Sequence, residues 1–168
     1  MPSKKTPPLP DLSWHPLAQA AAARAAEKPR FSRLHWAAKL GRLEEMVAAL
    51  DAGDDIEARD TVGENTPLHY AVINGQAAAV ALLLERGAHI NALEVMGNTP
   101  LMYAIHARHE DIAHMLLDAG ADIRPANKMG ATAESVAAYD HDLLAAVRRA
   151  GLLQVAAKGA ADPGRPPI

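Results

Sequence analysis

The chain has 168 residues, and its 17 lysines and arginines against 20 aspartates and glutamates give a formal net charge of −3. This length suits one domain, and the slightly acidic balance argues against nucleic-acid binding, which usually needs a broad cationic surface. Cysteine is absent, which excludes disulfides, thiolate metal sites and cysteine nucleophiles and favours a reducing, cytoplasmic location.

Residues 1–30 form an arm rich in proline and alanine in which basic residues outnumber acidic ones. Within it, the alanine-rich stretch from Leu17 to Glu27 favours a helix that would cap the domain. In the stretch from Lys4 to Pro10, a P-x-x-P pattern follows two lysines. Segments of this type bind in an extended conformation to aromatic-lined grooves of other proteins. Whether the arm packs on the domain or binds separately stays open.

Residues 31–152 repeat themselves with offsets of 34 and 33 residues. The recurring positions are a leucine followed by histidine or methionine, and a later glycine: Leu34-His35, Leu68-His69 and Leu101-Met102, then Gly53, Gly87 and Gly120. A repeat at this period indicates a stacked architecture. We expect units at about 31–60, 61–93, 94–126 and 127–152, followed by a flexible tail at 153–168.

The second unit shows how one repeat folds. Thr66 can cap a helix that starts at Pro67, and Gly75 permits the left-handed turn that ends it. A second helix follows from Gln76 to Glu85. Neither helix can bury its apolar face alone, so the units must stack. The stacked core is expected to consist of the recurring leucines of both helices: Leu34, Leu68, Leu101, Leu50, Leu84 and Leu117.

The string from Thr66 to Ala71 reads TPLHYA and resembles the T-P-L-H-x-A signature of the ankyrin repeat. The resemblance implies an all-α repeat solenoid of helix-turn-helix units with short β-hairpin fingers. It also implies that His35 and His69 are structural, and that the protein is a non-catalytic module without a cofactor. Its alanine-rich, arginine-favouring composition indicates a GC-rich, bacterial genome.

Several positions depart from this pattern. Glu64 is an extra residue in the finger before Thr66, Met102 replaces the signature histidine, and Arg108 replaces the turn glycine. A left-handed Arg108 would cost about 1 kcal/mol, so a rearranged turn is an alternative. The fourth unit has Glu134 where leucine is expected, which predicts a terminal cap.

Ankyrin repeats bind partners through the fingertips and first helices, which line a concave face. The matching fingertip residues are Asp60, Thr61, Val62, Glu64, Val95, Met96, Lys128 and Met129, and those on the first helices are Lys39, Leu40, Ile73, Asn74, His106, Ala107, Tyr139 and Asp140. Val95, Met96 and Met129 would form an apolar centre, with charges from Asp60, Glu64 and Lys128 around it, unless these residues pack on the next finger. Trp36, Tyr70 and Tyr103 share one repeat position and are either half-buried stacking residues or anchors.

The partner is expected to be a protein with a basic surface, because carboxylates run densely from Asp51 to Glu64. The alternative for this run is an ordinary solvated surface. The free protein is expected to be a monomer that acts as an inhibitor, an immunity protein or a scaffold.

An alternative function is a ligand- or metal-responsive protein that uses His106, His109 and His114. No cysteine or tight carboxylate cluster completes a zinc site there. Enzyme motifs such as G-x-S-x-G and glycine-rich phosphate loops are absent. No apolar run reaches the roughly 18 residues of a membrane span, and the N-terminus lacks an export signal, so no membrane partner is expected.

Overall fold

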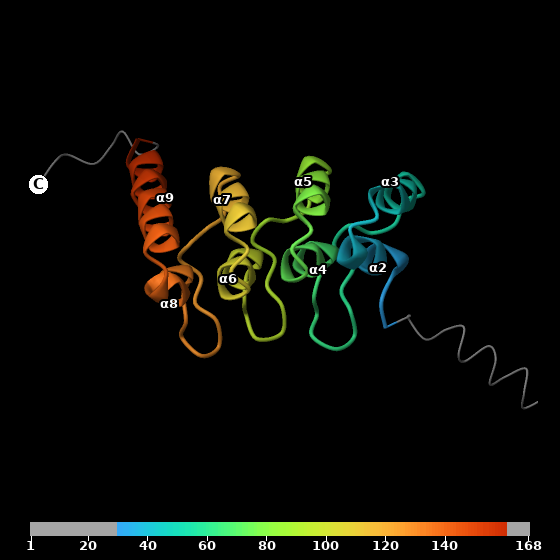
Figure 1. The fold of residues 1–168 in the computed structure, drawn as a ribbon, viewed down its shortest axis with the longest axis horizontal. Helices are drawn as coiled ribbons and strands as arrows, with labels where there is room; N and C mark the ends of the chain where they lie inside the picture. Colours follow the sequence, from blue (N-terminus) through green and yellow to red (C-terminus); the bar gives the residue numbers. More distant parts are fainter. Residues whose placement is uncertain (1–29, 161–168) are drawn as a thin grey trace, which may run out of the picture.

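The computed structural model describes residues 30–160 as a row of helix pairs joined by long loops (Figure 1). The first helices of the pairs are α2 (Arg33–Leu40), α4 (Pro67–Ile73), α6 (Pro100–His106) and α8 (Ala133–Val136), the last followed by the 3-10 helix η1 (Ala137–Tyr139). The second helices are α3 (Leu43–Asp51), α5 (Ala77–Glu85), α7 (Glu110–Asp118) and α9 (His141–Ala160). The helix predicted from Leu17 to Glu27 and the P-x-x-P segment lie outside the described residues.

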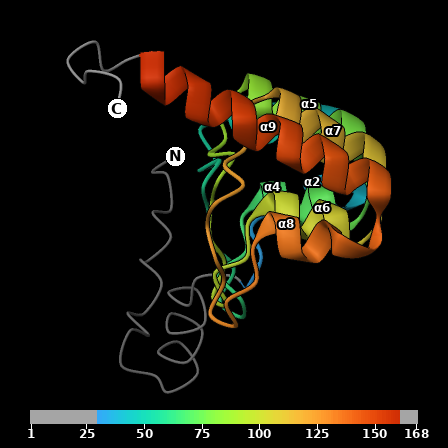
Figure 2. The same ribbon diagram turned by 90° about the vertical axis from the view of Figure 1, so that its left-hand side faces the viewer.

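The helices form two layers. Figure 2 shows α3, α5, α7 and α9 in one layer and α2, α4, α6 and α8 in the other, with the long loops to one side. This arrangement confirms a helical repeat solenoid. No helix in the described part of the chain is long and apolar enough to cross a membrane.

A hydroxyl side chain caps the N-terminus of each first helix. Ser32, Thr66, Thr99 and Thr132 each accept a hydrogen bond from a backbone amide in the first turn, and Pro67 and Pro100 occupy positions where no amide is needed. These caps confirm the start predicted from the threonine-proline pairs.

In each of the first three helix pairs, the turn between the two helices contains one residue in the left-handed conformation. Gly41 and Gly75 have φ values of 67° and 68°, and Arg108 takes the same conformation at 58°. The turn therefore survives at Arg108 despite its side chain, and it is not rearranged.

The core follows the repeat. Leu34, Leu68 and Leu101 are fully buried, as predicted. On the second helices the expected Leu117 is buried, with 9% of its surface exposed, but the expected Leu50 and Leu84 are only partly buried. Leu83 and Leu116, each one residue before an expected position, are fully buried. A shift by one residue turns a helix by roughly 100°, which is why the repeated leucines marked the edge of the core on this layer.

The predicted β-hairpin fingers are not confirmed, because no strand occurs between residues 30 and 160. The fingers are the loops 52–66, 86–99 and 119–132. One backbone hydrogen bond closes each tip, from Asp60, Glu94 and Asn127 to the carbonyls of Asn65, Asn98 and Ala131. Several other tip amides, among them those of Val62, Met96 and Met129, bind side-chain oxygens and not a partner strand.

The last helix extends beyond the boundary expected at residue 152. α9 continues through Gly151 to Ala160, so residues 153–160 are helical. A Cβ atom on Gly151 would lie 2.7 Å from Cδ1 of Ile123, and Gln154 donates a 2.7 Å hydrogen bond to the carbonyl of Ala121. Gly151 therefore allows α9 to approach the loop after α7, rather than ending the helix.

Candidate functional site

The fingertips, defined as residues 60–65, 94–98 and 127–131, share one internal design. The first residue of each tip accepts hydrogen bonds from later amides of the same tip. Asp60 Oδ1 accepts from Val62 and Gly63 at 2.7 Å. The Glu94 carboxylate accepts from the amides of residues 96 and 98 at 2.9 Å, and Asn127 Oδ1 accepts from those of residues 129 and 131 at 2.9 Å. These bonds fix the tip backbone and turn the following side chains outward.

Asp60 is the most enclosed of these three residues, with 3% of its surface exposed. Burial raises the pKa of its carboxyl, but the amides of Gly63 and Val62, the Tyr70 hydroxyl and the Asn65 side chain together hold that pKa at about 2. Burial and the bond to Asp60 raise the pKa of Tyr70 to about 12. Asp60 was expected to contact a partner, but its carboxylate is bound inside its own finger, so it supports the tip.

The three tips are joined into one row. The Val95 amide donates to the carbonyl of Gly63, and the Lys128 amide donates to that of Met96, both at 2.8 Å. The Asn127 side-chain amide also donates to Asn98 Oδ1 at 2.7 Å. Each fingertip is therefore positioned by its neighbour.

Most of the predicted binding residues lie on a surface that we call the inner surface, formed by the exposed side chains of the fingertips and of α2, α4, α6, α8 and η1. The exposed ones are Leu40, Thr61, Val62, Glu64, Ile73, Asn74, Val95, Met96, His106, Ala107, Lys128, Met129 and Tyr139. Met129 and Tyr139 are 82% and 98% exposed, whereas Val95 and Met96 are 40% and 43% exposed. The middle fingertip thus packs partly on its neighbours and still presents apolar atoms.

Two predicted residues are half-buried and already engaged. Lys39 lies over the Trp36 ring, with Nζ 5.2 Å from the ring centroid. Asp140 accepts the amides of Asp142 and Leu143 at 3.1 Å and so caps the start of α9. Both contribute to the edges of the inner surface.

The aromatic residues at the shared repeat position behave differently from one another. Tyr70 and Tyr103 are half-buried and stand edge-on to His35 and His69, with ring centroids 5.6 Å and 5.8 Å apart. Trp36, in contrast, is 49% exposed. The tyrosines are stacking residues, and only the tryptophan is open to a partner.

Charge is divided between the helix layers. α2, α4 and α6 contain no aspartate or glutamate, and α3, α5 and α7 contain no lysine or arginine. The carboxylates of these second helices are Glu44, Glu45, Asp51, Glu85, Glu110, Asp111 and Asp118. The carboxylates of these six helices therefore all lie on the outer layer, whereas the inner surface still carries the exposed Glu64 of the first fingertip and Glu134 of α8.

The acidic run from Asp51 to Glu64 is largely used within the domain. Asp51 pairs with Arg86 at 2.9 Å and Asp54 with Arg33 at 2.5 Å. Glu57 accepts the amide of His89 at 2.7 Å. These contacts join neighbouring units and favour a structural role for the run.

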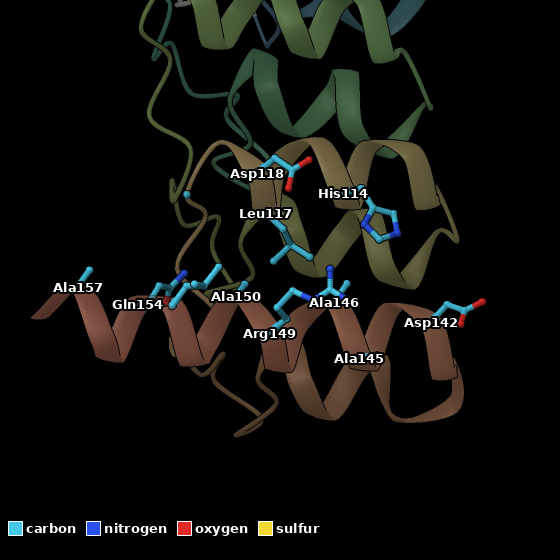
Figure 3. A pocket seen from close by; sticks show the side chains of 12 residues that line it. His114, Leu117, Asp118, Asp142, Ala145, Ala146, Arg149, Ala150, Gln154 and Ala157 are labelled. Atoms are coloured by element: carbon cyan, nitrogen blue, oxygen red, sulfur yellow. The ribbon is translucent and has the colours of Figure 1, made fainter. Parts of the chain in front are cut away.

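A groove of about 540 Å³ lies in the outer layer, between α7 and α9 (Figure 3). Small side chains of α9, among them Ala146 and Ala150, leave this space open, and His114, Asp118 and Arg149 border it. The groove is on the layer away from the inner surface, and it holds none of the predicted binding residues.

The structure does not bring the three predicted histidines into a metal site. His109 Nε2 lies 3.3 Å from the carbonyl oxygen of Ile73, and His114 points from α7 toward α9 (Figure 3). Among the described residues, no group of three histidine or carboxylate side chains could hold a metal ion.

Sequence reasoning missed the role of Asp60, Glu94 and Asn127 as supports of the tips. The signal was present, because these residues recur at the same offsets as the leucines and all carry a side-chain oxygen.

Comparison with known proteins agrees with the repeat geometry. A family model described as ankyrin repeats, in three copies, matches residues 34–127. No curated protein matches the chain.

Proposed function

Because the chain belongs to the ankyrin repeat family, whose repeats generally mediate protein-protein interaction, we propose that it binds a partner protein through the inner surface. The observation that carries this proposal is the row of apolar side chains on three joined fingertips. Val62, Val95, Met96 and Met129 are each at least 40% exposed, although their backbone is held by hydrogen bonds at every tip.

A fixed backbone with adaptable side chains suits binding. The tips are already ordered, so docking costs little conformational entropy. The two methionines can adjust to the shape of a partner. Ile73 on α4 and Tyr139 on η1 extend the apolar area, and the half-buried Lys39 and the exposed Lys128 give it a polar rim.

Proteins of this family are generally non-catalytic, and we propose no reaction for this one. The inner surface would serve an inhibitor, an immunity protein or a scaffold, since each acts by occupying a surface of its partner. The identity of the partner decides among these roles. For His106, His109 and His114 we propose no ligand- or metal-responsive role, since no group of three histidine or carboxylate side chains in the described part of the chain could hold a metal ion.

The proposal is tested by affinity capture of partners with the full chain and a variant that carries Met96→Glu and Met129→Glu. A matched control carries Leu152→Glu and Val155→Glu, which place the same charges on two α9 residues that are 73% and 70% exposed. We expect one partner to be retained by the wild type and the control and lost by the fingertip variant, with unchanged helicity. Retention by the fingertip variant, or loss in the control alone, would contradict the proposal.

A further inference from the structure

The third unit lacks a bond that the first two units make. His35 Nε2 lies 3.0 Å from the carbonyl oxygen of Asn65, and His69 Nε2 lies 3.4 Å from that of Asn98. These histidines tie a first helix to the next fingertip. The equivalent carbonyl in the third unit belongs to Ala131, and among residues 30–160 it accepts only the Asn127 amide, at 2.9 Å. The side chain of Met102 has no N–H group that could donate to this carbonyl.

A cavity opens beside this missing bond. It has a volume of about 320 Å³, and its walls come from α6, α8 and the last fingertip. Met102, Tyr103, His106, Met129 and Val136 line it. Ligand pockets usually span about 300 to 1,000 Å³, so this cavity suits one large side chain better than a cofactor.

The cavity wall itself contains no carboxylate, and the neighbouring Glu94 is 6% exposed, with its carboxylate held by the amides of Met96 and Asn98. Lys128 is exposed on the same fingertip and forms no ion pair with any residue from 30 to 160. His106 stands in the wall, and α6 carries no carboxylate. Asp140 lies near the end of α8, but it caps α9 and lies 3.9 Å from Arg108. A peptide segment with carboxylates next to its apolar anchor would complement this opening.

We propose that the cavity between α6, α8 and the fingertip 127–131 receives one leucine, methionine or phenylalanine side chain of the partner, and that acidic residues beside this anchor contact Lys128. The inference rests on the proposed function and specifies its partner as an apolar segment with acidic flanks. It differs from the basic partner that the acidic run from Asp51 to Glu64 predicts, because no carboxylate lines the cavity and the exposed Lys128 lies on the same fingertip.

The test uses a random peptide library displayed on phage and selected on the full chain. Synthetic copies of the selected peptides are then titrated against two variants with matched controls. Ala131→Leu fills the cavity, and Ala48→Leu adds the same group to an exposed position of α3. Lys128→Glu reverses the charge at the cavity, and Arg149→Glu does so on the exposed side of α9. Thermal unfolding monitored by circular dichroism shows whether each variant is folded.

We expect the selected peptides to share one large apolar residue with aspartate or glutamate beside it. Ala131→Leu should raise their dissociation constant at least about tenfold, and Lys128→Glu should raise it by about fivefold, an effect that weakens as salt is added. The two controls should bind like the wild type. Peptides that are basic, that bind Ala131→Leu as tightly as the wild type, or that fail to be enriched at all would overturn the inference.

The same peptides separate this inference from the proposed function. Some peptides could bind the Met96→Glu, Met129→Glu variant more weakly but bind Ala131→Leu as tightly as the wild type. That result would support binding by the inner surface and would overturn the assignment of the cavity. Peptides that lose affinity for neither variant would overturn both.

Discussion

The hydroxyl of Tyr70 donates a 2.9 Å hydrogen bond to Oδ2 of Asp60, which joins a first helix to the fingertip before it. The other carboxylate oxygen holds the amides of Val62 and Gly63. One buried carboxylate thus connects the helix to the residues that face the solvent at the tip.

This connection predicts the effect of Tyr70→Phe, which removes one donor from Asp60 and leaves the ring in place. A hydrogen bond to a charged group contributes roughly 1.5 to 3 kcal/mol, and Asp60 keeps its other donors. We expect the free energy of unfolding at pH 7 to fall by about 1 to 2 kcal/mol, measured by urea denaturation. Tyr139→Phe is the control, because Tyr139 is 98% exposed and should give no change. Equal stabilities for the two variants would contradict the role of the bond.

The buried histidine of the second unit predicts a pH dependence of stability. Burial lowers the pKa of His69 to about 4, and its Nδ1 accepts the Thr66 amide at 3.2 Å, which requires a neutral ring. The unfolded chain binds this proton near pH 6.5. The contribution of the neutral ring is therefore complete above about pH 6.5 and is lost as the pH falls toward 4, by about 3 kcal/mol in total.

His69→Met tests this dependence, since methionine occupies the equivalent position in the third unit. Guanidinium denaturation at several pH values from 7 to 4.5 should give a steep slope for the wild type and a flatter one for the variant. The exposed His106 provides the control His106→Gln, which should keep the steep slope. The pKa of Asp60 falls from 3.8 in the unfolded chain to about 2 in the folded state, so this carboxyl affects the slope only slightly near pH 4.5, and it does so equally in the wild type and both variants. A variant as pH-dependent as the wild type would show that another group titrates.

Local interactions made much of the fold predictable from the sequence. The helix caps, Pro67 at the start of its helix and the glycine turns depend on contacts within a few residues, and they recur at one period. The buried Leu34, Leu68 and Leu101 followed from the same register. A repeated sequence pattern reveals such features because every unit makes the same local contacts.

Other features depend on contacts between units and could not be predicted in this way. Whether Asp60 faces solvent or the inside of its tip depends on how a loop closes, which its residue type does not show. The cavity beside Met102 depends on a carbonyl group 29 residues later in the chain. The division of charge between the helix layers does not show in the net charge of the chain, and the expectation of a basic partner stays a prediction.

The left-handed turn at Arg108 predicts a stabilising substitution. Its φ of 58° matches the conformation of Gly41 and Gly75 at the equivalent turns, and a side chain in this region costs roughly 1 to 2 kcal/mol. Glycine also has more conformational freedom in the unfolded chain than arginine, which offsets part of this gain. Arg108→Gly should therefore raise the free energy of unfolding by only about 0.5 to 1 kcal/mol. Arg108→Ala loses the same contact with Asp140 but keeps the strained Cβ, so it should not be stabilised. A gain in both variants would point to the lost charge instead of the turn.

The missing histidine of the third unit predicts that Met102→His stabilises the domain. The new ring would lie where His35 and His69 lie, with Thr99 as the capping residue before it and the Ala131 carbonyl within reach of its Nε2. A completed cap and one further hydrogen bond should add about 1 kcal/mol to the free energy of unfolding at pH 7. The gain should disappear near pH 5, because the unfolded chain then binds a proton on the new histidine, whereas the folded ring must stay neutral to accept the Thr99 amide. Met102→Leu serves as the control, since it keeps an apolar side chain without a donor and should show neither the gain nor its loss with pH. If Met102→His is no more stable than the wild type at pH 7, the Ala131 carbonyl is not free to accept a second hydrogen bond.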